Sequence, residues 1–210
     1  MTVSDSDVDR VVQAARQLPP AEGNYLVDDF VTNLLATVID FQMHTTAVEN
    51  ALLHFRNNLH EQIRTLDDLQ ALMAQYPNDK EGNTALAQGL WGYKLWTRAE
   101  MLRGLVAFFD RTGIRDQEAL HRWAQGAKFK PDFEGQVRGL GPTVFQWLVM
   151  RQGVETVKPD VHVRRFAERS VGRTLNDQAV VDVVTRAATI LGVKAYELDW
   201  AIWEHERGQS

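Results

Sequence analysis

Apolar residues recur at helical spacing along almost the whole chain, and stretches that alternate apolar and polar residues are scarce. Residues three and four apart share one face of a helix, whereas the two faces of a strand alternate residue by residue. The pattern therefore predicts an all-α protein. We expect about ten helices, some of them merged from neighbouring segments, near residues 5–18, 25–43, 46–59, 66–75, 84–90, 97–112, 116–125, 132–138, 142–152, 161–170, 177–191 and 195–206.

Several short motifs predict where these helices begin. Thr46–Glu49 and Thr97–Glu100 have the pattern of capping boxes, in which a threonine hydroxyl and a glutamate three residues later satisfy main-chain N–H groups. Thr65–Asp68 is a weaker version of the same pattern. Asp116 and Asp177 are expected to cap the helices that follow them.

Length and composition bound the class of protein. The chain has 210 residues, 44% of them hydrophobic, which suffices for one domain or for two small lobes with a real core. The absence of cysteine excludes disulfides, cysteine-ligated zinc, iron–sulfur clusters and cysteine nucleophiles. No run of about 18 apolar residues predicts a membrane span, and the N-terminus does not look like a signal peptide. We therefore expect a cytoplasmic protein.

The charge is unevenly distributed. The net charge is -5, yet residues 121–173 hold ten Lys and Arg against five Asp and Glu. A cationic segment in an acidic protein can form a phosphate-binding face, or it can be an ordinary solvated surface of mixed charge. Charge alone leaves both interpretations open.

A glycine turn between two short helices is expected at Gly139–Gly141. Pro142 suits the first position of the following helix, and Gly153 is expected to end that helix. Such a turn presents main-chain N–H groups that suit a phosphate, although a plain connection between helices has the same appearance.

Asp160 follows Gly141 by nineteen residues, in the segment Lys-Pro-Asp-Val-His-Val-Arg-Arg. Pro159 restricts the backbone before it, so Asp160 is expected at the entrance to the helix that begins near Val161. An aspartate there can be an ordinary N-cap, and His162 can be an ordinary structural histidine.

The glycine turn followed by Asp-x-His-x-x-Arg resembles the signature of the helix-hairpin-helix base-excision DNA glycosylases, which include endonuclease III. Residues 34–55 are similar to the helix–turn–helix in which the family inserts a glutamine into DNA, and Gln42 stands at that position. Residues 92–102 resemble the turn before the family's long central helix. The similarity covers roughly residues 30–206.

The resemblance implies two helical lobes with a cleft, one formed by residues 31–145 and the other by residues 1–30 with 146–210. The partner would be double-stranded DNA, bound by a monomer with the target base flipped out of the duplex. Asp160 would stabilise the positive sugar that forms as the N-glycosidic bond breaks. No cofactor is expected except a monovalent cation at the Gly139–Gly141 hairpin, and no metal or iron–sulfur cluster.

Two positions depart from relatives of known chemistry. Thr143 occupies the place where bifunctional members carry a Schiff-base lysine, and Thr37 stands where adenine glycosylases have a glutamate. Thr143 favours a monofunctional glycosylase that uses water, or a protein that has lost catalysis, and Thr37 argues against specificity for adenine. The alternatives are a non-catalytic DNA-binding or lesion-sensing protein of the same fold, and an α-helical protein–protein module.

The remaining candidate residues follow from the resemblance. For contacts to DNA we expect Gly139, Gly141, Thr143, Gln42, Arg138, Arg164 and Arg165. For the base pocket we expect Asp40, Met43, His44 and Trp96. Further candidates for stacking on a flipped base are Trp91, Tyr93, Trp147, Trp200 and Trp203, each of which can equally be a core residue.

Overall fold

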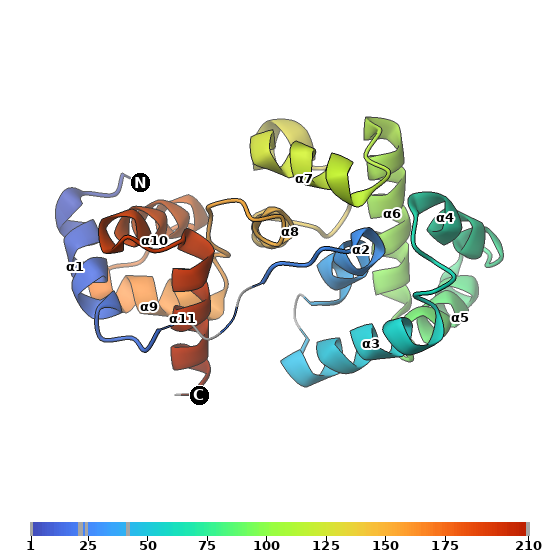
Figure 1. Cartoon of the computed structure of the whole chain (residues 1–210), viewed down its shortest axis with the longest axis horizontal. Helices are drawn as coiled ribbons and strands as arrows, with labels where there is room; N and C mark the ends of the chain where they lie inside the picture. The colour runs from blue at the N-terminus through green and yellow to red at the C-terminus, as the bar shows by residue number, and fades with distance from the viewer. Residues whose placement is uncertain (1, 21–22, 24, 41–42, 209–210) are drawn as a thin grey trace. The chain divides into compact units, whose positions relative to one another are not determined.

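The structure is a computed structural model that describes residues 2–20, 23, 25–40 and 43–208. Within these residues every regular element is a helix, so the predicted all-α class is confirmed. None of these helices is long and apolar enough to cross a membrane. In chain order (Figure 1) the elements are α1 (Asp5–Ala15), α2 (Phe30–Ile39), α3 (Thr45–Asn58), α4 (Leu66–Ala74), α5 (Lys80–Trp91), α6 (Trp96–Thr112), α7 (Gln117–Gly126), the π-helix η1 (Phe129–Phe133), α8 (Pro142–Met150), α9 (Val161–Val171), α10 (Asp177–Leu191) and α11 (Ala195–Arg207).

The chain divides into two compact units. One comprises Met1–Leu26 and Phe145–Ser210, and the other comprises Val27–Val144. The first border follows residue 26, where we expected it after residue 30, and the second falls inside α8, one residue before the expected position. Apart from α8, which the border divides, each helix belongs to one unit.

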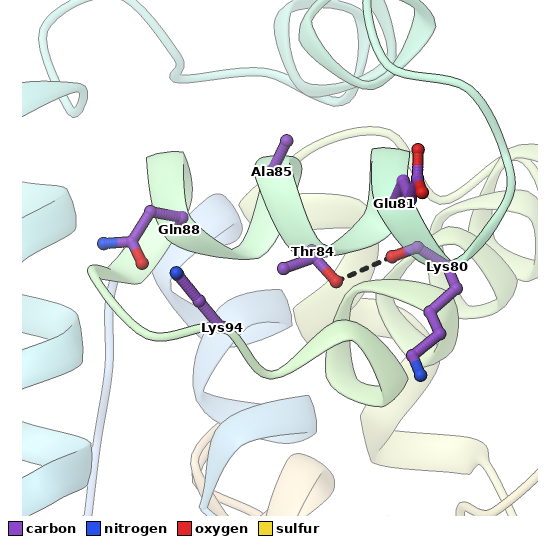
Figure 2. Close-up of a pocket in the computed structure, with 6 residues that line it drawn as sticks. All are labelled: Lys80, Glu81, Thr84, Ala85, Gln88 and Lys94. Atoms are coloured by element: carbon purple, nitrogen blue, oxygen red, sulfur yellow. Dashed lines mark hydrogen bonds between the residues drawn. The ribbon is translucent and has the colours of Figure 1, made fainter.

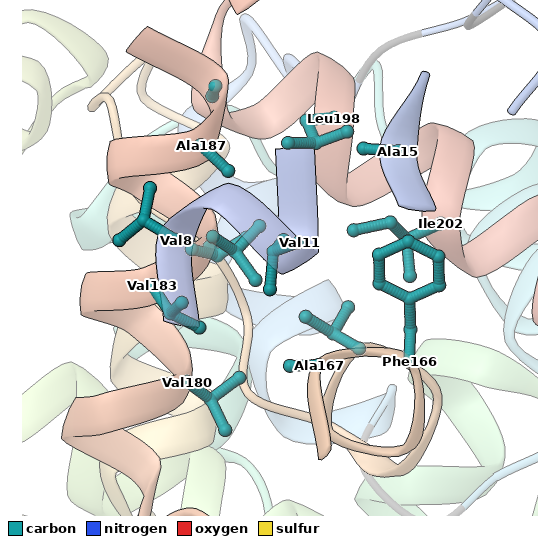
Figure 3. Packing of buried hydrophobic residues seen from close by; sticks show 14 of the residues in the cluster. Val8, Val11, Ala15, Phe166, Ala167, Val180, Val183, Ala187, Leu198 and Ile202 are labelled. Atoms are coloured by element: carbon teal, nitrogen blue, oxygen red, sulfur yellow. The ribbon is translucent and has the colours of Figure 1, made fainter. Parts of the chain in front are cut away.

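In the first unit α1, α9, α10 and α11 pack around one apolar core. Val8 and Val11 lie on the inner face of α1 because residues three apart share a helical face, and both are fully buried. Figure 3 shows them beside Val183 of α10, Phe166 of α9 and Ile202 of α11. Burial of each such side chain contributes about 1.5–3 kcal/mol, so this core fixes α9 and α11 against each other.

In the second unit α6 is the central helix and packs against α2, α4 and α5, while α3 packs against α2 and α5. Every residue of α2 is buried. Thr37, in the middle of α2, is fully buried and donates its hydroxyl proton to the carbonyl of Asn33 at 2.6 Å. That position therefore serves the packing of α2.

Two of the expected capping boxes are wrong. The helix at Thr46–Glu49 begins with His44 as its N-cap, and the helix at Thr97–Glu100 begins with Leu95; neither cap residue has a side-chain bond. Both helices start two residues earlier than a capping box at the threonine indicates. Each threonine is therefore the second helical residue, where its hydroxyl does not cap the helix.

Other start signals hold. Thr65–Asp68 forms a complete capping box at α4, and the Asp116 carboxylate accepts the N–H of Ala119 at α7. Asp177 is the first residue of α10, so the expected cap there is wrong: Asn176 takes that role through a bond from the N–H of Ala179.

The helix expected at residues 132–138 is wrong. The chain instead makes one π-helical turn over Phe129–Phe133, closed by the Glu134 N–H, which donates to the Phe129 carbonyl at 2.8 Å. Pro131 has no N–H to extend a regular helix, and Gly135 has a φ of +74° that turns the chain away. Turns then lead to Gly139.

Candidate functional site

Asp160 is the N-cap of α9, as its place after Pro159 predicts. Its Oδ1 accepts the N–H groups of His162 at 2.9 Å and Val163 at 3.0 Å. Its Oδ2 lies 3.7 Å from the Lys158 ammonium, and the side chain is 16% exposed. One oxygen thus holds the start of α9, and the other lies in a cationic environment at the surface.

Lys158 connects Asp160 to a second carboxylate that the sequence analysis missed. The main-chain N–H of Lys158 donates to Oδ2 of Asp199 at 2.7 Å, and its ammonium lies 4.3 Å from the centre of the Trp147 ring. Asp199 is on α11 and is 1% exposed. Tyr25 also hydrogen-bonds to the Asp199 side chain.

Burial, and after it the negative charge of Asp160, raises the pKa of Asp199 to about 7; the bonds and charge of Lys158 and the bond from Tyr25 oppose this rise. A signal in the sequence could have found Asp199. It shares a helical face with Ala195, four residues before it, and Ile202, three residues after it, both buried, so the periodicity of α11 places an acid on an apolar face.

A group of aromatic rings begins at Trp147, under Lys158, and Tyr25, beside Asp199. Tyr25 meets Trp147 and Trp200 edge to face, each at 4.6 Å between ring centres, and Trp203 lies 5.7 Å from Trp200. The indole N–H groups of Trp147 and Trp200 and Nδ1 of His162 are buried and, within the described residues, have no hydrogen-bond partner. Buried polar atoms of this kind are costly unless a ligand or water satisfies them.

The glycine turn lies in the other unit. Gly139 has a φ of +88°, and a Cβ there would come within 2.6 Å of the Met101 methyl carbon. A Cβ at Gly141 would meet nothing within 4 Å, so another molecule has room to approach. Pro142 is the first residue of α8, as predicted, and Thr143 follows it half-buried.

Two predicted cationic contacts differ in their surroundings. Arg138, beside the turn, is exposed, as are Lys128 and Lys130 of the preceding segment. Arg164, on α9, instead donates to the Leu175 carbonyl at 2.7 Å and forms an ion pair with Asp177. Arg164 thus connects α9 to α10, whereas Arg138 remains at the surface of the turn.

Arg165, also on α9, is exposed. The structure therefore brings Arg138 together with the glycine turn in one unit, and Arg164 and Arg165 together with Asp160 in the other.

Among the expected base-pocket residues, Asp40 is the C-cap of α2 and its carbonyl accepts the Met43 N–H at 3.4 Å. His44 is exposed at the start of α3. Trp96 is half-buried at the start of α6. Gln42, the expected intercalating residue, lies outside the described residues.

Two pockets in the described part of the chain are lined by none of these candidates. One of about 460 Å³ runs along α5, and Figure 2 shows Lys80 and Gln88 at opposite ends of the row of lining residues, with Lys94 on the loop that follows the helix. Its lining is Lys80, Glu81, Thr84, Ala85, Gln88 and Lys94. The Lys80 ammonium also lies 5.9 Å from the Trp96 ring. Another, of about 520 Å³, is lined by Thr2, Val3, Glu155, Thr156, Val181, Asp182, Thr185 and Arg186.

In the described parts of the chain, no group of three or more His, Asp or Glu residues could hold a metal ion.

A family described as a domain of unknown function (DUF8548) matches residues 9–207. The match spans nearly the whole chain and includes helices of both units, so the protein belongs to this family. No curated protein and no solved structure matches the chain.

Proposed function

We propose that this member of the DUF8548 family is a monofunctional DNA glycosylase that uses Asp160 to hydrolyse the N-glycosidic bond of a flipped, damaged or modified base. The observation that carries the proposal is the environment of Asp160. Its carboxylate is 16% exposed and accepts two N–H groups of the first turn of α9, and the neighbouring Lys158 ammonium rests on the Trp147 ring of the same unit.

In the proposed reaction the bond between the sugar C1′ and the base nitrogen breaks, and the bonding electrons leave with the base. Positive charge then develops on the sugar, and an adjacent carboxylate stabilises it more strongly than it stabilises the neutral substrate. A water oxygen adds to C1′, and the proton that the water loses neutralises the departing base or passes to Asp160. The two main-chain N–H groups on Oδ1 hold the carboxylate in one orientation for this role.

Contacts to DNA would come from the glycine turn. The first main-chain N–H groups of α8 suit a phosphate oxygen, and the open space at Gly141 lets the DNA backbone approach. Lys128, Lys130 and Arg138 would add positive charge beside it. A monovalent cation at this turn would have only main-chain and neutral ligands, since residues 137–141 include no carboxylate, and no step of the reaction uses one.

Thr143 supports the monofunctional assignment, because its hydroxyl cannot form a Schiff base with the sugar. The test is a panel of duplexes that carry deaminated, alkylated, oxidised or mismatched bases. We expect base release from at least one duplex, detected as strand cleavage only after alkali treatment, and no covalent adduct with borohydride. A strong adduct would refute the water mechanism, since it would require an amine nucleophile such as Lys158.

The alternative is a DNA-binding or lesion-sensing protein without catalysis. One observation favours it: both oxygens of Asp160 already have partners, namely two N–H groups and the Lys158 ammonium. The same panel separates the two functions. A non-catalytic sensor would bind one lesion more tightly than intact DNA and release no base from any duplex.

A further inference from the structure

Lys158 presents a difficulty for the proposed reaction. Its ammonium stands 3.7 Å from Oδ2 of Asp160, so a positive charge sits beside the carboxylate that is to stabilise a positive sugar. Two opposite charges this close largely offset each other for a third charge nearby. Some other group must therefore balance Lys158 if Asp160 is to act.

We propose that Asp199 is this group: a positioning residue that holds Lys158 and offsets its charge, so that Asp160 presents a net negative charge to the substrate sugar. The inference rests on the proposed function and adds to it a second acid that does not touch the DNA. Its basis is the contact of Asp199 Oδ2 with the main chain of Lys158 at 2.7 Å, two residues before Asp160.

The charges around this group can be counted from each neighbouring segment. The 158–160 segment supplies Lys158 and Asp160, and α11 supplies Asp199. Arg151, after α8, lies 4.9 Å from the Trp147 ring on which Lys158 also rests, and its side chain is almost fully buried. Tyr25 contributes a neutral hydroxyl bond to Asp199.

His162 follows Asp160 by two residues on α9, and its ring lies 6.4 Å from that of Trp203. Asp160, Lys158 and Asp199 together carry a charge of -1 when Asp199 is ionised and none when it is protonated. Because burial raises the pKa of Asp199 to about 7, this change falls in the neutral range. The attraction of the group for a cation should therefore increase as the pH rises through 7.

The test compares two duplexes that differ only at one nucleotide. One carries a pyrrolidine abasic analogue, a cationic mimic of the reacting sugar, and the other a neutral tetrahydrofuran analogue. The readout is the ratio of the two dissociation constants between pH 5.5 and 8.5. We expect the preference of the wild-type protein for the cation to rise by about tenfold over this range, since a unit charge acts strongly in a partly buried site.

Asp199→Asn should hold that preference at its low, acidic value at every pH. Asp182→Asn, which removes an exposed charge from α10 of the same unit, is the matched control and should behave as wild type. Lys158→Met removes the positive charge beside Asp160 in a protein that keeps Asp199. At pH 6 this variant should prefer the cationic analogue over the neutral one as strongly as wild type does at pH 8.

Several results would overturn the inference. Among these are an Asp199→Asn protein whose preference follows the wild-type pH curve, and a Lys158→Met protein with no gain at pH 6. Loss of binding to both analogues by the wild-type protein would instead reject the proposed function, and the inference with it. A folding defect in Asp199→Asn leaves the Lys158→Met arm decisive, because the main-chain bond to Asp199 survives that change.

Discussion

In the proposed reaction Asp160 has two tasks, one for each oxygen of its carboxylate. Oδ1 caps α9 through two N–H groups, which is a structural role that many aspartates have. The same bonds orient the side chain, so capping positions the carboxylate for electrostatic catalysis. The two roles therefore do not compete.

Local chemistry made some of these residues predictable. Asp160 after Pro159, Asp116 before α7 and Pro142 at the start of α8 all follow from rules that act within a few residues. Asp199 and its contact with Lys158 do not, because they depend on how α11 packs beside a segment 41 residues earlier. Its place on an apolar helical face was visible, but its partner was not.

Asp199 should also give the protein a characteristic dependence of stability on pH. Its pKa is about 7 in the folded state against an ordinary value of 3.8, so the folded state binds the extra proton between these values. This residue's contribution therefore favours folding at low pH and is lost as the pH rises towards 7. Across that window the change is of the order of a few kcal/mol.

Asp199→Asn should remove this contribution. The free energy of unfolding of the variant minus that of wild type should be larger at pH 8 than at pH 5. Urea unfolding at both pH values measures this difference, with Asp182→Asn as the control. Parallel stability curves for wild type and Asp199→Asn would show that Asp199 does not titrate in this range.

The segment before the glycine turn shows how periodicity can mislead. Phe133 and Val137 are four apart and both buried, which favours a helix, yet Pro131 and Gly135 limit regular structure to one π-helical turn. The two breakers were present in the sequence. Apolar residues at this spacing predict a helix, but successive turns can bury the same side chains. The spacing alone therefore does not distinguish the two structures.

The two glycines of the turn offer a matched pair. Gly139→Val should destabilise the protein by about 1–3 kcal/mol, because a φ of +88° is unfavourable for valine and its Cβ would collide with Met101. Gly141→Val should leave the melting temperature close to wild type, since a Cβ there meets nothing within 4 Å. It should nevertheless weaken binding to duplex DNA by blocking the phosphate.

Affinity measured at several salt concentrations, together with a melting curve for each variant, checks this pair. A Gly141→Val protein that binds duplex DNA as tightly as wild type at every salt concentration would contradict the proposed role of the turn.

For the molecule as a whole, the net charge of -5 conceals how the cations are used. Arg164, Arg169 and Arg173 form ion pairs with Asp177, Glu206 and Asp7, so part of the basic segment stabilises the fold. The sequence indicated the excess of positive charge over residues 121–173, but which cations would be paired depends on tertiary contacts. The helical class was predictable from periodicity, since it needs no such contacts.

The central claim is that the charge of Asp160 drives base release, and Asp160→Asn tests it most directly. Asparagine keeps the size of the side chain and can cap α9, so the fold and DNA binding should persist. Single-turnover excision of the best substrate, measured beside a melting curve, should be slower by a factor on the order of 100 or more. An Asp160→Asn protein that is as stable and as active as wild type would contradict the account and reduce Asp160 to a helix cap.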